Sequence, residues 1–337
     1  MKRCPSKSFL QHRTLCLRYF LLAIFPLLLS VGCSRPSKVT IAVIPRTSGT
    51  ALWEPEHRGA QDAAEKIGAN IYWNAPTREG DVAGQIRLID HAIAKGYQGM
   101  ILAPSHSLAL VTPVRRALAH GLPIVIISSP LPVPAGANLS YVLNDEQEGG
   151  RIAARRIAQL LRGSGTVAVL GINPDVAGIM TRTQSFESFL SANYPGIHVI
   201  ESHIGSFNVP HEQEVAEEVL EAHPNLDAVV ALMWSSARGA ISTIDNNPGK
   251  FKARVIAFDP EDILFTSPSL DAVIVQNTRE MGNLAVQLIH SRLGGRSTPA
   301  LITLKPILVT RANAHSEEVL HMTTMDWRPG WSLSHTP

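Results

Sequence analysis

Three polar and two aromatic residues stand at the ends of apolar segments, where residues of these types could bind a sugar. Asp259 and Gln276 close two apolar segments, Arg182 begins a helical pattern behind a third, and Trp53 and Phe207 follow others in loops. A carboxylate, an amide and a guanidinium bridge vicinal hydroxyl groups, while aromatic rings cover an apolar C–H face. Together they predict a binding site for a sugar-like molecule. Singly, each also fits a structural role: a helix cap for Asp259, a surface ion pair for Arg182, and a core for the aromatic rings.

Motifs of the common catalytic and nucleotide-binding sites are absent from the sequence. It contains no GxxxxGK[ST], HExxH or GxSxG, and no GxGxxG behind a strand pattern. His211-Glu212-Gln213-Glu214 matches no known metal-ligand spacing and is better explained as a solvated helix start. The formal net charge of +2 gives no electrostatic footprint for nucleic acid. We therefore predict a binding protein with no catalytic residues, metal or cofactor.

The first 32 residues have the composition of a targeting segment. Residues 1–18 carry five basic and no acidic side chains, and an apolar run of 11 residues, 19–29, follows. That run is too short to span a bilayer as a helix and is typical of a signal peptide. Ser30-Val31-Gly32-Cys33 resembles a bacterial lipobox, although Ser30 stands where an aliphatic residue is usual. The pattern predicts a signal peptide over 1–32 and a lipidated tether over 33–37; an ordinary signal peptide and an uncleaved anchor are the alternatives.

Short apolar runs alternate with helical patterns along the rest of the chain. Most runs are rich in Val and Ile and nearly continuous, which is typical of parallel strands covered on both faces. Val82, Ile86, Ile89 and Ile93 form an apolar stripe at helical spacing between two such runs. The alternation predicts right-handed strand–helix–strand units in doubly wound parallel sheets. The predicted strands are 39–44, 70–73, 100–103, 123–128, 140–143, 166–172, 198–202, 228–233, 254–258 and 272–276.

The strand pattern occurs twice, which predicts two similar lobes rather than one large sheet. The gap between the strands that begin at residues 39 and 100 is similar to the gap between those that begin at 166 and 228. Ligands of such sheets bind beyond the carboxyl ends of the strands. Two lobes that face each other would therefore form a binding cleft at these ends.

From Lys38 to about Asn313 the sequence resembles the periplasmic sugar-binding proteins of the ribose type. These proteins share their fold with the sensor domains of LacI-type repressors. No single motif carries the resemblance, which rests on the order and spacing of several landmarks. The landmarks are Trp53 before Gly59-Ala60, Pro123-Ile124-Val125-Ile126-Ile127, Asn144-Asp145 before Gly149-Gly150, Arg182 before Ser185-Phe186, Ala222-His223-Pro224-Asn225-Leu226-Asp227-Ala228, Gly239-Ala240 and Phe258-Asp259.

The resemblance implies a periplasmic-binding-protein type I fold, an α/β architecture of two doubly wound lobes joined by a hinge of three chain crossings. The N-terminal lobe would comprise 38–143 plus 278–303, and the C-terminal lobe 144–277 plus 304–312. The tail 313–337 is not assigned by the resemblance. Both packing onto a lobe and a flexible end remain open for it.

The resemblance also implies roles for the five residues at the segment ends. Trp53 would stack on the sugar and Arg182 would donate to its hydroxyl groups. Phe207, Asp259 and Gln276 match further contact positions of the family. Arg182 is followed by Ser185, where the family's pattern has a glycine.

Other contact positions depart from the family. Ser128 and Ser129 stand where the family usually has Asp-Arg, and Met233 and Trp234 stand where it has Asn-Asp. Thr50 replaces a common asparagine. These departures remove two carboxylates and one guanidinium and add an indole. They predict a less hydroxylated, modified or partly apolar ligand in place of ribose, glucose or galactose.

The function implied is that of an extracytoplasmic, lipid-anchored solute-binding protein on the periplasmic or cell-surface side. It would capture a sugar or sugar-like molecule in the interlobe cleft and deliver it to the membrane subunits of an ABC-type permease. A ligand-sensing receptor for a membrane sensor kinase or chemoreceptor is the alternative. A repressor would need a helix-turn-helix where the signal segment stands, and an enzyme would need a base–nucleophile pair or a metal set.

Overall fold

The computed structural model describes residues 38–259 and 265–323. The predicted signal peptide, the predicted lipidation site Cys33 and the tether 33–37 lie outside these ranges. Within them, no helix combines the length and the apolar character needed to cross a bilayer.

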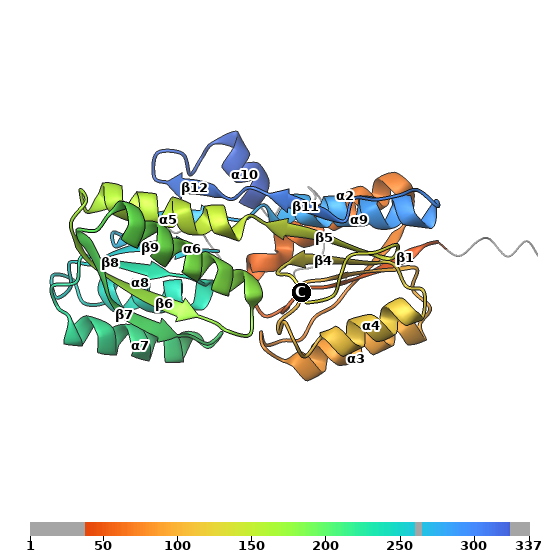
Figure 1. Ribbon diagram of the computed structural model, residues 1–337, viewed down its shortest axis with the longest axis horizontal. Coiled ribbons are helices and arrows are strands. Elements are labelled where there is room, and N and C mark those ends of the chain that lie inside the picture. Colours follow the sequence, from red (N-terminus) through yellow and green to blue (C-terminus); the bar gives the residue numbers. More distant parts are fainter. Residues whose placement is uncertain (1–37, 260–264, 324–337) are drawn as a thin grey trace, which may run out of the picture. The chain divides into compact units, whose positions relative to one another are not determined.

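Lobe one is built on a sheet of six parallel strands. Its middle strands are almost wholly buried, because helices cover both faces. The strands are β1 (Thr40–Ile44), β2 (Asn70–Trp73), β3 (Gly99–Leu102), β4 (Ile124–Ser128), β5 (Leu139–Asn144) and β11 (Leu301–Leu304). Across the sheet they lie in the order β11-β5-β4-β3-β1-β2 (Figure 1). Helices α2 (Glu54–Ile67), preceded by the 3₁₀ turn η2 (Ala51–Trp53), and α9 (Thr278–Leu293) cover one face, and α3 (Val82–Ala94) and α4 (Val111–Ala119) cover the other.

Lobe two repeats this arrangement with one difference at its edge. The strands are β6 (Gly165–Ile172), β7 (Ile197–Ile204), β8 (Ala228–Ala231), β9 (Arg254–Phe258), β10 (Leu270–Val275) and β12 (Ile307–Thr310). They lie in the order β12-β10-β9-β8-β6-β7, and β12 runs antiparallel to β10 (Figure 1). Helices α5 (Glu146–Leu160) and α6 (Ala177–Asn193) cover one face, and α7 (Val209–Ala222) and α8 (Trp234–Asp245) cover the other.

Glycines allow the helix pairs to pack in close contact. A Cβ on Gly59 of α2 would lie 1.9 Å from the backbone oxygen of Arg279 in α9, and a Cβ on Gly282 would lie 2.2 Å from that of Glu56. In lobe two, a Cβ on Gly150 would lie 2.4 Å from the backbone oxygen of Arg182. Any side chain at these positions would push the paired helices apart, which explains two of the sequence landmarks.

The chain passes between the lobes three times. It leaves β5 for α5 after Asn144, leaves β10 for α9 after Gln276, and connects β11 to β12 through Lys305 and Pro306. The backbone N–H of Asp145 donates to the oxygen of Leu304 at 2.8 Å, which joins the first crossing to the third.

The beginning of the tail packs against the fold. Helix α10 (Glu317–Thr323) buries Val319 and Met322 in the core between α7, α8 and the sheet of lobe two. Arg279 in α9 of lobe one donates to the backbone oxygen of His321 at 3.3 Å. Of the two possibilities left open for the tail, packing onto a lobe therefore holds for the residues up to Thr323; Trp327 and Trp331 lie outside the described residues.

The prediction of a two-lobed α/β fold is confirmed, and each of the ten predicted strands has a counterpart. The predicted strand 228–233 ends at Ala231, because Leu232 and Met233 already lead into α8. Strands β11 and β12 and helix α10 were missed. These elements are short, with four residues in each strand and seven in the helix, and β11 lies at a sheet edge with an exposed Leu301.

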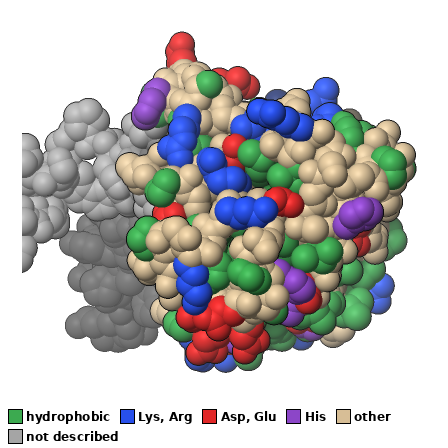
Figure 2. Space-filling model, turned by 90° about the vertical axis from the view of Figure 1, so that its left-hand side faces the viewer, with side chains coloured by type: hydrophobic (Ala, Val, Ile, Leu, Met, Phe, Trp, Pro, Cys, Tyr) green, Lys and Arg blue, Asp and Glu red, His purple; other side chains and the backbone are tan. Residues whose placement is uncertain are grey.

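Charged side chains of both signs share the face of the molecule that Figure 2 shows. Acidic side chains gather along its lower edge, and basic ones are spread over its middle. This interleaving agrees with the small formal net charge of +2. The face thus lacks the broad basic surface that binds nucleic acid.

Candidate ligand-binding cleft

Two residues with a left-handed backbone occupy equivalent places at the carboxyl edges of the two sheets. Ser128 ends β4 with φ 65°, and Asp259 follows β9 with φ 50°. Strands β4 and β9 hold the same rank in their sheets. A positive φ is uncommon outside glycine, and such strain tends to occur at functional sites. Both residues therefore mark the edges at which a ligand of a parallel sheet binds.

Arg182 of lobe two is held by two carboxylates. Its Nε and Nη2 donate to the two oxygens of Glu146 at 2.7 and 2.8 Å, and its Nη1 donates to Asp259 Oδ2 at 2.6 Å. The same Nη1 donates to the backbone oxygen of Leu232 at 3.0 Å, and the guanidinium lies 4.6 Å from the ring centroid of Phe258. Only 3% of the side chain is exposed. Most of its five N–H groups are therefore occupied within lobe two.

Two sequence interpretations change here. Arg182 was expected at the start of its helix, but α6 begins at Ala177, so Arg182 lies in its second turn. Glu146 was not predicted as a site residue. It is the first residue of α5, where an acidic side chain is ordinary because it stabilises the helix N-terminus, and its pairing with Arg182 joins residues far apart in sequence.

Gln276 extends this buried network towards the hinge. Its Nε2 donates to Asp259 Oδ2 at 2.9 Å and to Glu146 Oε1 at 3.3 Å. Its Oε1 accepts a hydrogen bond from Asn144 Nδ2. The structure thus brings together three of the predicted site residues, Arg182, Asp259 and Gln276.

Lobe one carries a second buried charge cluster, around Arg46. Its Nε donates to the backbone oxygen of Pro104 at 3.1 Å and its Nη2 to Ser128 Oγ at 3.2 Å. Its Nη1 lies 3.7 Å from Glu79 Oε1, and its guanidinium lies 5.5 Å from the ring centroid of Trp53. Neither Arg46 nor Glu79 was predicted. Arg46 is a polar residue just after the end of a strand, as Asp259 is, so the sequence pattern that identified Asp259 could also have identified Arg46.

Charges of both clusters act on the buried ionisable groups. Burial lowers the pKa of Arg46, and charges of both lobes act on it: Glu79 from its own lobe, and Arg182, Asp259 and Glu146 from lobe two. Burial raises the pKa of Glu79, against the effect of Arg46. Burial also raises the pKa of Glu146, against Arg182. Burial thus disfavours the charged forms of Arg46, Glu79 and Glu146, and the opposite charge beside each of them favours these forms.

Hydrogen bonds at the facing edges also connect the lobes directly. Trp234 Nε1 of lobe two donates to Glu79 Oε2 at 2.9 Å. The backbone N–H of Gly178 donates to Ser129 Oγ at 3.0 Å. The backbone N–H of Ser107 donates to the oxygen of Asp175 at 2.7 Å.

A cavity of about 880 Å³ opens between the lobes beside the Trp234–Glu79 bond. Three of the predicted site residues, Thr50, Phe207 and Trp234, line it. From lobe one it is lined by Thr47, Gly49, Thr50 and 77–83, and from lobe two by 206–210 and Trp234. It has the volume of a small-molecule site.

Two predicted site residues lie largely in cores. Trp53 is 3% exposed and packs between α2, α9 and the sheet, although its ring also lies beneath Arg46 and its Nε1 has no hydrogen-bond partner in the described structure. Met233 is 2% exposed and belongs to the core of lobe two. For Met233 the structure favours a packing role.

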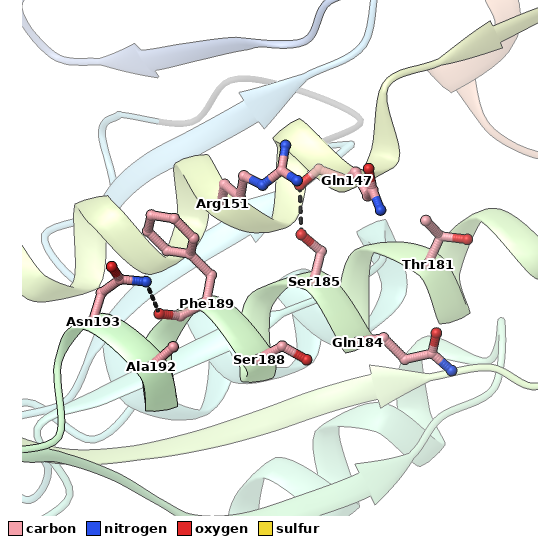
Figure 3. Close-up of a pocket in the computed structure, with 9 residues that line it drawn as sticks. All are labelled: Gln147, Arg151, Thr181, Gln184, Ser185, Ser188, Phe189, Ala192 and Asn193. Carbon is pink, nitrogen blue, oxygen red and sulfur yellow. Dashed lines mark hydrogen bonds between the residues drawn. The ribbon is translucent and has the colours of Figure 1, made fainter.

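A separate cavity of about 460 Å³ lies outside the cleft, between α5 and α6 (Figure 3). Arg151 and Gln147 line it from α5, and Ser185 and Phe189 line it from α6. Ser185 Oγ donates to the backbone oxygen of Gln147 at 2.6 Å. None of its lining residues belongs to the charge clusters. Among the described residues, no three His, Cys, Asp or Glu side chains are grouped so as to hold a metal ion.

The model of the periplasmic binding protein domain matches residues 41–297 of this chain. The chain belongs to this family. Members of the family bind solutes and are not enzymes, as predicted for this chain. The D-allose-binding periplasmic protein of Escherichia coli (strain K12) is 26% identical over 84% of this chain and 93% of the relative. The D-apiose import binding protein of Paraburkholderia graminis is 23% identical over 81% of this chain and 88% of the relative.

Solved structures of solute-binding proteins share the two-lobed fold. An ABC transporter solute-binding protein from Agrobacterium vitis, bound with α-D-tagatopyranose, superimposes with a TM-score of 0.77 at 27% identity, covering 85% of this chain and 99% of that one. A carbohydrate transporter solute-binding protein from Agrobacterium radiobacter, in complex with D-arabinose, gives a TM-score of 0.79 at 24% identity, covering 86% and 100%.

Proposed function

We propose that this chain is the extracytoplasmic binding component of an ABC-type sugar importer. It captures a sugar or sugar-like molecule between its lobes and delivers it to the membrane subunits of the permease, while lipid on Cys33 holds it at the membrane. The observation that carries the proposal is the pair of charge clusters, Arg182–Asp259 and Arg46–Glu79, at the facing carboxyl edges of the two sheets. The relatives named above, which bind or import sugars, support it.

Asp259 is the group of lobe two best placed to accept hydrogen bonds from hydroxyl groups. Both of the contacts it makes with Arg182 and Gln276 go to Oδ2. Because Arg182 is occupied by Glu146 and Asp259, we assign to it the orientation of Asp259 rather than a large share of the ligand contacts. This differs from the role that the family resemblance implied for the arginine.

Several buried polar atoms have no hydrogen-bond partner in the described structure. They include Trp53 Nε1, Ser105 Oγ and Asn144 Oδ1, and the last two residues stand at or behind carboxyl ends of lobe-one strands. An unpaired buried donor or acceptor costs about 1–3 kcal/mol. A polyhydroxylated ligand would offer these atoms the partners they lack.

Closure of the lobes on the ligand is the motion that the crossings permit. The Trp234–Glu79 and Gly178–Ser129 hydrogen bonds form only while the lobes are together. The lobes would open by breaking them, and a bound ligand would add contacts that favour the closed state.

A thermal-shift and calorimetric screen of the purified, processed protein tests the proposal. The probes are D-allose, D-ribose, D-apiose, D-tagatose and D-arabinose, each with the wild type and with Asp259→Ala. A true ligand at 100-fold excess over its Kd stabilises the fold by about 2.7 kcal/mol. Loss of two charge-assisted hydrogen bonds at about 1.5–3 kcal/mol each predicts at least 100-fold weaker binding by Asp259→Ala. Absence of any shift over a broad sugar panel would overturn the proposal.

A further inference from the structure

Glu212 of α7 is a buried acid in a segment that the sequence pattern explained as a solvated helix start. The side chains of its neighbours His211 and Glu214 are 53% and 75% exposed, which agrees with that explanation. Glu212 itself is 1% exposed, so the explanation is wrong for this residue. It lies in the first turn of α7, where a Cβ on Gly239 of α8 would lie 2.7 Å from the backbone oxygen of Glu212. A carboxyl group buried at this helix contact needs a hydrogen-bond partner.

The partner of the Glu212 carboxyl group is Ser206, in the loop between β7 and α7. Glu212 Oε1 accepts a hydrogen bond from the backbone N–H of Ser206 and another, at 3.3 Å, from Ser206 Oγ. From α8, Ser235 Oγ donates to the backbone oxygen of Ser206 at 2.8 Å. Side chains of two helices therefore hold both polar groups of the Ser206 backbone.

Phe207, the next residue of this loop, has neighbours with fixed positions on both sides. Before it, the backbone N–H of Gly205 donates to the oxygen of Ile172 at 2.8 Å. After it, the backbone N–H of Asn208 donates to Ser206 Oγ at 3.3 Å. The side chain of Phe207 lines the interlobe cavity and packs against the core of lobe two. The contacts of Ser206 therefore set the place from which this ring reaches the cavity.

Glu212 has an ordinary alternative role, because an acidic side chain in the first turn stabilises a helix N-terminus without any contact to a loop. The geometry favours the loop. Both printed bonds of Glu212 Oε1 go to Ser206, and Asn208 already caps α7 by accepting from His211 N at 3.3 Å. Burial raises the pKa of Glu212, and the hydrogen bonds from Ser206 act against this shift. The bonds that hold the loop are thus also those that favour the ionised carboxyl group.

We propose that Glu212 is a positioning residue of the ligand site, which fixes Phe207 on the wall of the interlobe cavity by holding Ser206. The inference rests on the proposed function, since it concerns a ring that a sugar would contact in that cavity. A ring that is held in place before binding loses less conformational freedom when the ligand packs against it. Glu212 therefore raises the affinity without touching the ligand.

Fluorine NMR of the ligand-free protein, with 4-fluorophenylalanine in place of Phe207, tests the positioning directly. Glu212→Met fills the same space without a hydrogen-bond acceptor, and Glu212→Gln retains one. We expect one sharp signal for the wild type and for Glu212→Gln, and a shifted, broadened or split signal for Glu212→Met. Glu214→Met changes an exposed acid of the same helix and should leave the signal unchanged. A wild-type signal in Glu212→Met overturns the inference.

Calorimetry measures the effect on binding, with D-allose, D-ribose, D-apiose, D-tagatose and D-arabinose as probes. For a sugar that the wild type binds, we expect Glu212→Met to weaken binding about 3- to 10-fold, the range for ordering one side chain on binding. In a Phe207→Ala background the same substitution should cost no further affinity, because there is no ring to position. Equal losses with and without the ring would show a general structural role and overturn the inference.

The outcomes distinguish this inference from the proposed function. Absence of binding by every sugar overturns the proposed function, and the fluorine signals then decide on Glu212 alone. Sugar binding that Glu212→Met leaves unchanged overturns the inference and leaves the proposed function in place. If Glu212→Met loses its fold in thermal melts, Glu212→Ala provides the same comparisons.

Discussion

The side-chain amide of Asn144 donates a hydrogen bond to the side-chain oxygen of Gln276, and so ties together two of the three chain crossings. The two residues end equivalent strands, β5 and β10, and each precedes a helix N-cap: Asp145 accepts from Glu148 N at 2.9 Å and Asn277 from Glu280 N at 3.0 Å. The first two crossings thus have the same local structure. The chain passes from lobe one to lobe two at the first and returns to lobe one at the second.

Asn144→Ala is expected to destabilise the protein by about 1–3 kcal/mol, because it leaves the buried oxygen of Gln276 without its donor. Urea unfolding measures the change. Asn193→Ala, which removes an exposed side-chain bond at the end of α6, should cost well below 1 kcal/mol and serves as the control. Equal effects of the two substitutions would show that the hinge bond is dispensable.

Arg182→Met should destabilise by about 3–5 kcal/mol, because it leaves Glu146 and Asp259 buried without their cation. Urea unfolding at neutral pH tests this. Arg116→Met removes an ion pair with Asp90 in which both side chains are far more exposed than Arg182 and Glu146. It should cost less than about 1 kcal/mol. A loss for Arg182→Met as small as that of the control would contradict the central role given to Arg182.

The stability of ligand-free Glu56→Gln should exceed that of the wild type at neutral pH, with a gap that closes on acidification. Burial raises the folded-state pKa of Glu56, so the folded protein binds this proton more tightly than the unfolded chain does. The wild type therefore loses stability as the pH rises from the unfolded pKa through the folded pKa, and the variant does not. Urea unfolding at a series of pH values from acid to neutral measures the gap. A gap that does not change with pH would show that the pKa of Glu56 is the same in the folded and the unfolded state.

Trp234→Phe should weaken ligand binding by about 10- to 100-fold while the unfolding midpoint stays within experimental error. It removes one hydrogen bond to a charged group, worth about 1.5–3 kcal/mol, that exists only between closed lobes. Calorimetry on the best sugar of the panel measures affinity. Trp53→Ala should behave differently and lose about 3–5 kcal/mol of stability, because Trp53 is part of a core.

Cys33→Ser tests the anchor. If Cys33 carries lipid, the wild type needs detergent for release from membranes, and the variant appears in the soluble fraction with an altered processed mass. Identical fractionation and mass for the two proteins would count against lipidation.

The sequence was sufficient for the architecture, because apolar runs and helical periodicity are local properties. It also predicted Asp259, Arg182 and Gln276, which the fold brings into one network. It did not predict Glu79 or Glu146, because a glutamate in the first turn of a helix or in a loop has an ordinary local explanation. Only long-range pairing distinguishes these from surface charges. Ser128 and Ser129 lack the charges that the family usually has at these two positions. Arg46 and Glu79, from other parts of lobe one, place a cation and a carboxyl group close to Ser128 instead.

The pairing of α2 with α9 has a consequence for the order in which the molecule can fold. Helix α9 and strand β11 come from the last third of the chain, yet they cover a face and complete an edge of the lobe that the first third begins. A nascent chain that ends before Thr278 would leave the apolar face around Ile101 and Ala63 open to water. The lobe synthesised first can therefore be completed only after most of the lobe synthesised second has been made, and a chaperone that binds exposed apolar surface should hold the unfinished chain until that point.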